Sequence, residues 1–131
     1  MPVITITSKS QFDSLIKSTP FVALQASASW CGPCKAISPH FVKHSEKGID
    51  ETFVFAKFDT DDVPDLASEL EVRSLPTFYF IENENKADAT KVTGANPGAL
   101  KKTVEEVEEK AKKVAENAKT NGGSLPTDED F

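Results

Sequence analysis

The residues best suited to chemistry are the two cysteines of the chain, which occur together in the segment Trp30-Cys31-Gly32-Pro33-Cys34. Two thiols separated by two residues can close a small disulfide ring when they lie on the first turn of a helix. A helix N-terminus supplies free backbone N–H groups and a partial positive charge, and both stabilise a thiolate. Because the thiolate is the reactive form of cysteine, this segment predicts a site of dithiol–disulfide exchange.

Length, composition and charge limit the class of protein that can carry such a site. The 131 residues predict one domain with an appendage, and 38% hydrophobic and 27% charged residues are typical of a soluble globular protein. The net charge of −6 argues against nucleic acid and anionic membrane surfaces as partners. Residues 1–7 lack the features of a secretory signal, and no apolar run is long enough to cross a bilayer. We therefore expect a reducing, cytoplasmic location.

Hydrophobic patterning predicts strands that alternate with helices. The expected strands cover residues 3–6, 21–26, 52–58, 78–81 and 90–93, and the expected helices cover 8–17, 33–47, 61–70 and 97–118. Ser8 and Gln11 match a capping box, Asp61 or Asp62 is expected to cap the third helix, and Pro39 is expected to kink the second. This order, which ends with a hairpin and a helix, indicates an α/β fold with a mixed sheet.

The WCGPC motif and the order of elements over residues 3–109 resemble the thioredoxin family. The resemblance implies a thioredoxin fold, with a central mixed sheet flanked by helices on both faces, and a protein-disulfide reductase that serves cell redox homeostasis. It implies that Cys31 is the nucleophile and Cys34 the resolving thiol, with no bound cofactor and no metal. The implied partners are substrate proteins with disulfides and a thioredoxin reductase-like, NADPH-dependent flavoprotein that supplies reducing equivalents. A monomer is favoured over a dimer.

The resemblance also assigns roles to residues away from the two cysteines. Pro76 matches a proline that is cis in thioredoxins and lies against the active-site segment, where its loop offers backbone groups to an extended substrate. Gly32 and Pro33 lie between the cysteines and support them. The implied apolar docking surface consists of Trp30, Pro33, Leu75, Pro76, Gly94 and Ala95. Ordinary packing remains an alternative role for the leucine and the alanine.

The chain departs from the family pattern beside this site. Gln25 stands where thioredoxins carry a buried aspartate and Ser27 where a tryptophan is common, whereas Lys57 is retained. A glutamine cannot take a proton, and loss of the negative charge should lower the thiol pKa values. A more stable thiolate stabilises the dithiol, so we expect a weaker reductant and slower resolution. The alternative is that water, Asp59 or Asp61 replaces the missing relay.

Other functions for the cysteines and for nearby histidines are less favoured. His40 and His44 follow the cysteines too closely for a zinc finger and lie beyond the predicted kink, so we expect them to be surface or partly buried polar residues. A structural disulfide would close a very short loop and stabilise little. A thioredoxin-like binding module with incidental redox activity is the main alternative function. An oxidase or isomerase of secreted proteins is disfavoured by the absence of a signal and by Pro33.

The last predicted helix is longer than the family pattern requires. Its apolar positions recur in steps of four and three at Leu100, Val104, Val107, Ala111, Val114 and Ala118. We divide the chain into a thioredoxin-like domain (1–109), an extension of this helix (110–119) and a disordered acidic tail (120–131). The weak Val and Ala seam favours a solvated extension over contact with a partner or a second copy.

Overall fold

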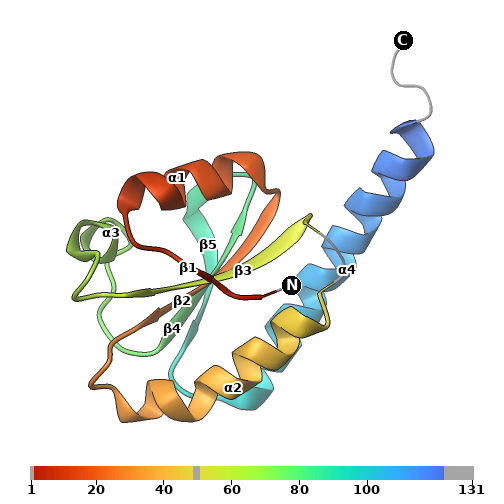
Figure 1. The fold of residues 1–131 in the computed structure, drawn as a ribbon. Coiled ribbons are helices and arrows are strands. Elements are labelled where there is room, and N and C mark those ends of the chain that lie inside the picture. The colour runs from red at the N-terminus through yellow and green to blue at the C-terminus, as the bar shows by residue number, and fades with distance from the viewer. Residues whose placement is uncertain (1, 49–50, 123–131) are drawn as a thin grey trace.

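A computed structural model describes residues 2–48 and 51–122, with side-chain surroundings through residue 116. In these ranges one five-stranded sheet has the order β1-β3-β2-β4-β5 and carries helices on both faces (Figure 1). The strands are β1 (Ile4–Thr5), β2 (Phe21–Ser27), β3 (Phe53–Asp59), β4 (Thr77–Glu82) and β5 (Asn85–Thr93). The helices are α1 (Lys9–Ser18), α2 (Gly32–Glu46), α3 (Pro64–Glu69) and α4 (Pro97–Gly122).

The sheet is mixed, which confirms the expected fold class. Strands β1, β3 and β2 run parallel, whereas β4 is antiparallel to β2 and β5 is antiparallel to β4. Strand β2 lies in the middle, and its residues 21–26 are all buried. A strand covered on both faces needs apolar side chains on each, which explains the nearly continuous apolar run.

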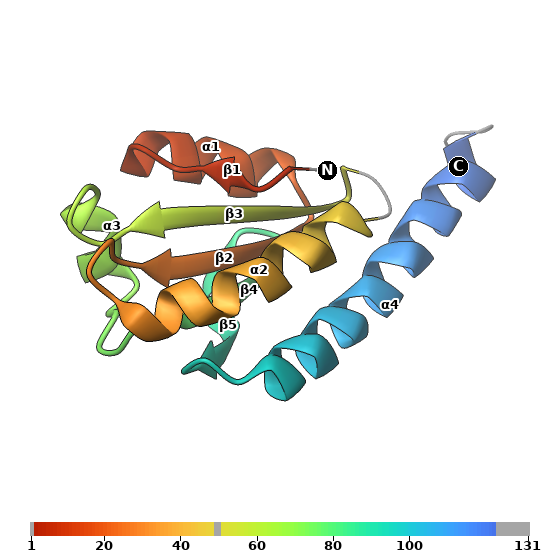
Figure 2. The same cartoon turned by 60° about the horizontal axis from the view of Figure 1, so that its bottom comes forward.

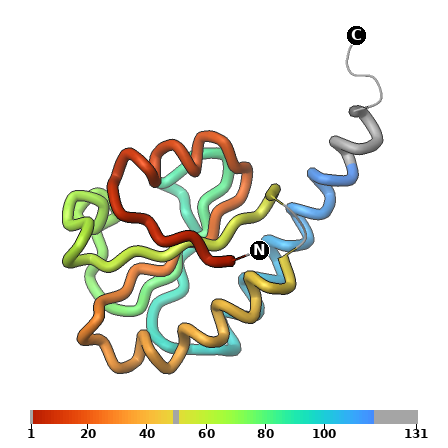
Figure 3. The backbone as a smooth tube through the Cα atoms, in the orientation of Figure 1, coloured from red at the N-terminus to blue at the C-terminus, as the bar shows by residue number. Residues whose placement is uncertain are grey.

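Two hydrophobic cores lie on opposite faces of the sheet. On one face α1 and α3 contribute Phe12, Ile16 and Leu66. On the other face α2 and α4 contribute Phe41 and Leu100 among others, against strand residues of the opposite alternation. Figure 2 shows α1 on one side of β2 and β3 and α2 and α4 on the other, and the tube in Figure 3 follows the same separation along the chain. The strands thus hold the beginning of α2 at the end of β2.

The helix boundaries differ from the expectation at α3. Its N-cap is Val63, which makes no side-chain capping hydrogen bond, so capping by Asp61 or Asp62 was wrong. Pro64 at the first helical position starts this helix instead, because proline has no N–H to satisfy there and its φ suits a helix. Helix α2 continues through Pro39 to Glu46.

Helix α4 begins as expected, since the Asn96 side chain accepts a hydrogen bond from the backbone N–H of Ala99 at 3.1 Å. Its buried face ends at Ala111 within the side chains described, and Val114 is 40% exposed. The helix extends to Gly122, four residues beyond the expected end, so residues 120–122 are helical. The rest of the expected acidic tail, 123–131, lies outside the described residues. No described helix combines the length and apolar character that crossing a membrane demands.

Candidate active site

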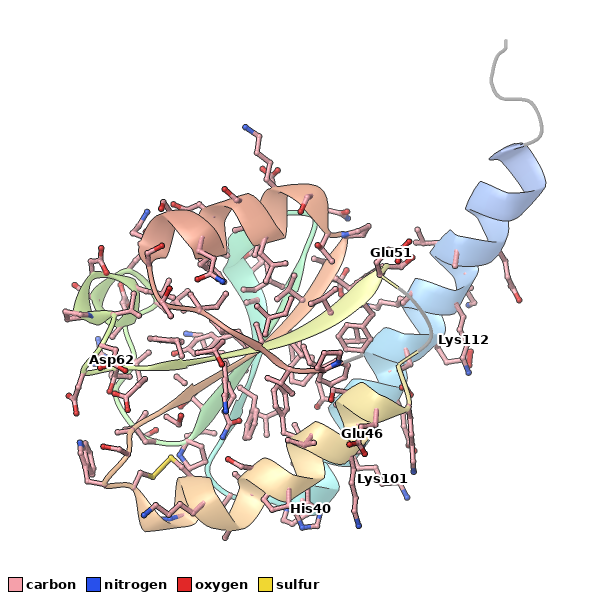
Figure 4. All side chains as sticks on the ribbon, viewed as in Figure 1. His40, Glu46, Glu51, Asp62, Lys101 and Lys112 are labelled. Carbon is pink, nitrogen blue, oxygen red and sulfur yellow. A yellow bond between two sulfur atoms is a disulfide. The ribbon has the colours of Figure 1, made fainter. Side chains whose placement is uncertain are left out.

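The two cysteines lie at the start of α2 and form a disulfide with a Cα–Cα distance of 5.3 Å. Cys31 is the N-cap residue, and its Sγ accepts a hydrogen bond from the backbone N–H of Cys34 at 3.2 Å. Pro33 occupies the first helical turn, where its missing N–H costs nothing. Figure 4 shows the sulfur–sulfur bond at this end of the helix. The Cys31 sulfur therefore takes the position at which a helix N-terminus stabilises negative charge.

The two sulfur-bearing residues open onto different sides of the site. Cys31 and Cys34 are 4% and 3% exposed, so little of either side chain is accessible to solvent. Cys31, but not Cys34, lines a groove of about 510 Å³, which we term the front groove. Cys34, but not Cys31, lines a cavity of about 260 Å³, which we term the rear pocket.

The front groove contains several residues of the expected docking surface. Trp30, Gly32, Pro33 and Leu75 line it together with Cys31, and Trp30 is 69% exposed. The indole Nε1–H of this tryptophan donates to the Asp61 carboxylate at 2.9 Å, which fixes an otherwise exposed ring.

The segment before β4 forms the wall of the groove. The Leu75–Pro76 peptide bond is cis, as the family pattern implies, and Leu75 packs against the cluster of Ala28 and the two cysteines. Gly94 donates its N–H to the Pro76 carbonyl at 2.8 Å, but neither Gly94 nor Ala95 lines the groove. Gly94 therefore adjoins the expected docking surface through Pro76, whereas no contact brings Ala95 to the groove among the described residues.

A chain of two hydrogen bonds connects Gln25, in the centre of the sheet, to the backbone of Cys34. Gln25 is 2% exposed, and its Nε2 donates to the Ser38 hydroxyl at 3.0 Å. That hydroxyl donates to the Cys34 carbonyl at 2.7 Å. Lys57 pairs with Gln25 in the β2–β3 register, yet its side chain is exposed and has no ion pair among the described residues. A neutral amide thus occupies the buried position beside the site.

The rear pocket distinguishes the two acids that were candidates for a relay. Asp59 lines this pocket together with Cys34 and Ser27. The Asp59 carboxylate accepts backbone N–H bonds from Ser29 at 3.0 Å and from Asp61 at 2.8 Å. Asp61 does not line the pocket and holds the indole instead.

The histidines lie away from the cysteines. His40 is exposed and lies well along α2 from the sulfur–sulfur bond (Figure 4). His44 is half-buried, and this burial lowers the pKa of its imidazole. Within the described ranges, no three His, Cys, Asp or Glu side chains gather in a cluster that could hold a metal ion.

Several contacts of the site were missed in the sequence. Ser38 lies four residues after Cys34 on the same helix, and this spacing could have placed its hydroxyl against the Cys34 carbonyl. Arg73, three residues before Pro76, lines the front groove with Val72. No local pattern marks the contact between Trp30 and an aspartate from another segment, because the fold alone brings them together.

A cysteine pair that closes a disulfide at a helix N-terminus, beside a cis-proline segment on a mixed sheet, defines the dithiol–disulfide exchange proteins of the thioredoxin fold. Comparison with known proteins makes the assignment specific. The Thioredoxin family model matches residues 3–106, and the chain belongs to the thioredoxin family.

Individual relatives agree with this assignment. The chain is 44% identical over 111 residues to Thioredoxin-like protein 1 of Schizosaccharomyces pombe, covering 85% of this chain but only 38% of that protein. It is 39% identical over 100 residues to the thioredoxin of Coprinus comatus, covering 76% of this chain and 92% of the relative. The solved thioredoxin of Malassezia sympodialis aligns with a TM-score of 0.74 at 33% identity, covering 81% of this chain and 90% of the other.

Thioredoxins are thiol–disulfide oxidoreductases, and the cysteine pair that this chemistry requires is present and oxidised here. Family membership and this pair together support a protein-disulfide reductase role in redox metabolism. Thioredoxins need no bound cofactor, because the two sulfurs themselves carry the electrons.

Proposed function

We propose that the chain reduces protein disulfides with Cys31 as the attacking thiolate and Cys34 as the resolving thiol. The observation that carries this assignment is that Cys31 caps α2 and also lines the front groove, whereas Cys34 faces the rear pocket. A substrate segment in the groove therefore meets the Cys31 sulfur first. The backbone N–H of Cys34, which donates to this sulfur at 3.2 Å, stabilises the thiolate that attacks.

The reaction proceeds in two exchanges. In the first, the Cys31 thiolate bonds to one sulfur of the substrate disulfide, that disulfide breaks, and the other substrate sulfur leaves as a thiolate. In the second, Cys34 loses its proton and attacks the Cys31 sulfur, which releases the remaining substrate thiolate. Two electrons pass to the substrate, and the protein is left with the disulfide seen here.

Substrate docking uses the apolar floor of the front groove and the segment that ends in Pro76. Trp30, Pro33 and Leu75 provide apolar surface beside the attacking sulfur. In the described parts of the chain, neither backbone polar group of Leu75 has a hydrogen-bond partner. These free groups suit the addition of an extended substrate strand. Gly94 holds the Pro76 carbonyl through its backbone N–H, and we assign Ala95, the next residue, to the same docking surface.

The oxidised protein requires a source of electrons for the next turnover. We assign this role to a thioredoxin reductase-like, NADPH-dependent flavoprotein, as in the family. We also place the protein in the cytoplasm as a monomer, although the relative Thioredoxin-3 of Saccharomyces cerevisiae is mitochondrial. Gly32, Gln25 and Lys57 act as supporting residues around the cysteine pair.

Insulin reduction driven by dithiothreitol tests the reaction, with Cys34→Ser and Cys31→Ser as paired variants. We expect both variants to lose turnover, but only Cys34→Ser to accumulate a mixed disulfide with substrate, because its attacking thiol remains. A wild-type protein that accelerates insulin reduction no more than a variant carrying both Cys31→Ser and Cys34→Ser would refute the proposal. Partner binding that survives both substitutions, without turnover, would instead identify a binding module.

A second assay addresses the electron source. NADPH and a thioredoxin reductase replace dithiothreitol, and NADPH consumption is followed by absorbance in the presence of insulin. Consumption that depends on the chain and on Cys31 supports the assigned partner. Activity with dithiothreitol but with none of several flavoprotein reductases would separate the chemistry from this partner.

A further inference from the structure

The front groove contains one charged side chain among the residues that line it, and that side chain is Arg73. Arg73 is also the only arginine in the 131-residue chain, which has a net charge of −6. Its guanidinium is exposed and makes no hydrogen bond or ion pair with the described residues. A fully charged group with five donors therefore lines an otherwise uncharged groove and has no hydrogen-bond or ion-pair partner among the described residues.

Two acids close to the groove residues do not line the groove: Glu71, two residues before Arg73, and Asp61, the hydrogen-bond partner of Trp30. Glu71 lines a separate cavity with Tyr79 and does not line the front groove. Asp61 accepts the hydrogen bond from Trp30 Nε1 at 2.9 Å and is likewise absent from the groove lining. The positive charge of Arg73 is therefore not neutralised from within the groove.

From these observations we infer that Arg73 determines specificity by binding an Asp or Glu side chain near the substrate cysteine. The inference rests on the proposed reductase function and specifies its substrate class as disulfide-bearing segments with an acidic residue. Guanidinium–carboxylate pairs can be bidentate, so the contact gives orientation as well as attraction. The apolar residues that flank it accept the neighbouring side chains of the segment.

The position of the acidic residue follows from chain geometry. Leu75 packs against Cys31. Arg73 lies two residues before Leu75, so the Cα atoms of Arg73 and Leu75 are separated by at most about 7 Å. An extended substrate advances by about 3.3 Å for each residue. Together with the length of an arginine side chain, this places the acidic residue roughly one to four residues from the substrate cysteine.

The test uses synthetic disulfide peptides that differ at one position, occupied by Glu, Gln or Lys, with that position moved through four residues on either side of the cysteine. Single-turnover reduction by the pre-reduced protein is followed by fluorescence of Trp30, the only tryptophan of the chain. At one position or more we expect Glu to react about two- to fivefold faster than Gln, and Lys to react more slowly. Raising the salt concentration should reduce this preference, because exposed charges are screened.

Substitutions at Arg73 supply the decisive comparison. Arg73→Gln should abolish the preference, Arg73→Glu should reverse it in favour of Lys, and Arg73→Lys should retain part of it because the point charge remains. Lys102→Gln, which removes an equal charge from the exposed surface of α4, should leave the preference unchanged.

The possible outcomes distinguish a failure of the inference about Arg73 from a failure of the proposed reductase function. Equal reduction of all peptides, or a preference that survives Arg73→Glu, would overturn the role of Arg73 and leave the reductase function intact. Failure of the wild-type protein to reduce any of the peptides, or insulin, would refute the function itself.

Discussion

Replacement of Gln25 by aspartate tests how the buried amide sets the reducing strength of this protein. Gln25 is 2% exposed and reaches the Cys34 carbonyl through the Ser38 hydroxyl, by hydrogen bonds of 3.0 and 2.7 Å. An ionised carboxylate at residue 25 would place a negative charge near the thiols and destabilise a thiolate there. Because the thiolate occurs only in the reduced protein, Gln25→Asp should make the protein a stronger reductant than the wild type.

The size of this effect can be estimated from Coulomb's law. The hydrogen bonds of residue 25 lead to the Cys34 carbonyl, and if the carboxylate and a thiolate are separated by about 7 Å, two unit charges interact by about 2 kcal/mol at an effective dielectric constant of 20. For a two-electron couple this energy lowers the reduction potential by about 40 mV. The value is an upper bound, since it assumes a fully ionised carboxylate and a full thiolate.

The pH dependence gives the prediction a distinct signature. Burial disfavours the charged form and so raises the pKa of the carboxyl introduced by Gln25→Asp above its unfolded value. Below that raised pKa the carboxyl is neutral and the shift in potential should disappear, whereas it should grow as the pH rises through the pKa. Because the pKa of this carboxyl is higher in the folded than in the unfolded protein, the free energy of unfolding of Gln25→Asp should fall, relative to a neutral residue, as the pH rises above the unfolded aspartate pKa of about 4.

Equilibrium redox titration against glutathione or dithiothreitol between about pH 6 and pH 9 measures this shift, because that range spans the ordinary pKa of a thiol. Gln25→Asn is the matched control, because asparagine has the shape of aspartate without its charge. Potentials of the two variants that agree at every pH would refute the electrostatic reasoning. A reduction potential for Gln25→Asp above that of Gln25→Asn would show that the charge acts in the direction opposite to the one predicted.

Three further predictions concern the residues that support the site. Leu100→Ala, in the core between α4 and the sheet, should lower the free energy of unfolding by about 2–5 kcal/mol in urea denaturation, whereas Val114→Ala on the exposed half of α4 should cost under about 0.5 kcal/mol. Ser38→Ala should cost about 1–3 kcal/mol by the same measurement, because the buried amide loses its acceptor. The pKa of Glu69 is lowered by hydrogen bonds from Lys86 and Lys9, so its contribution to stability is present above the unfolded glutamate pKa and is lost as the pH falls. Thermal melts should therefore show a smaller loss on acidification below about pH 4.5 for Glu69→Gln than for the wild type.

The fold could be predicted because its local signals agree with one another. The buried run of β2, the capping Ser8 and the Asn96-Pro97 start of α4 each point to the element found there. The prediction failed at the start of α3, where neighbouring residues determine which residue caps the helix. Two consecutive aspartates suggested a helix cap, but Asp61 is engaged by Trp30, and α3 starts at the following proline.

The chemistry of the site was predictable only where it is local in sequence. The spacing of Cys31 and Cys34 specifies a disulfide at a helix start, and this part of the prediction is confirmed. The front groove also depends on Arg73, and the rear pocket depends on Asp59, from segments that no local pattern connects to the cysteines. The choice between Asp59 and Asp61 as pocket residues required the arrangement of strands in space.

The separate openings of the two sulfurs have a consequence for the order of events during turnover. A protein substrate seated over Cys31 covers one entrance, while the other, bordered by the exposed side chains of Lys35 and Lys57, stays in contact with solvent. A proton can therefore leave Cys34 through the rear pocket while a substrate occupies the front groove. Under the proposed mechanism, substrate binding and proton release therefore use different openings, and Cys34 can lose its proton while the mixed disulfide between Cys31 and the substrate is still in place.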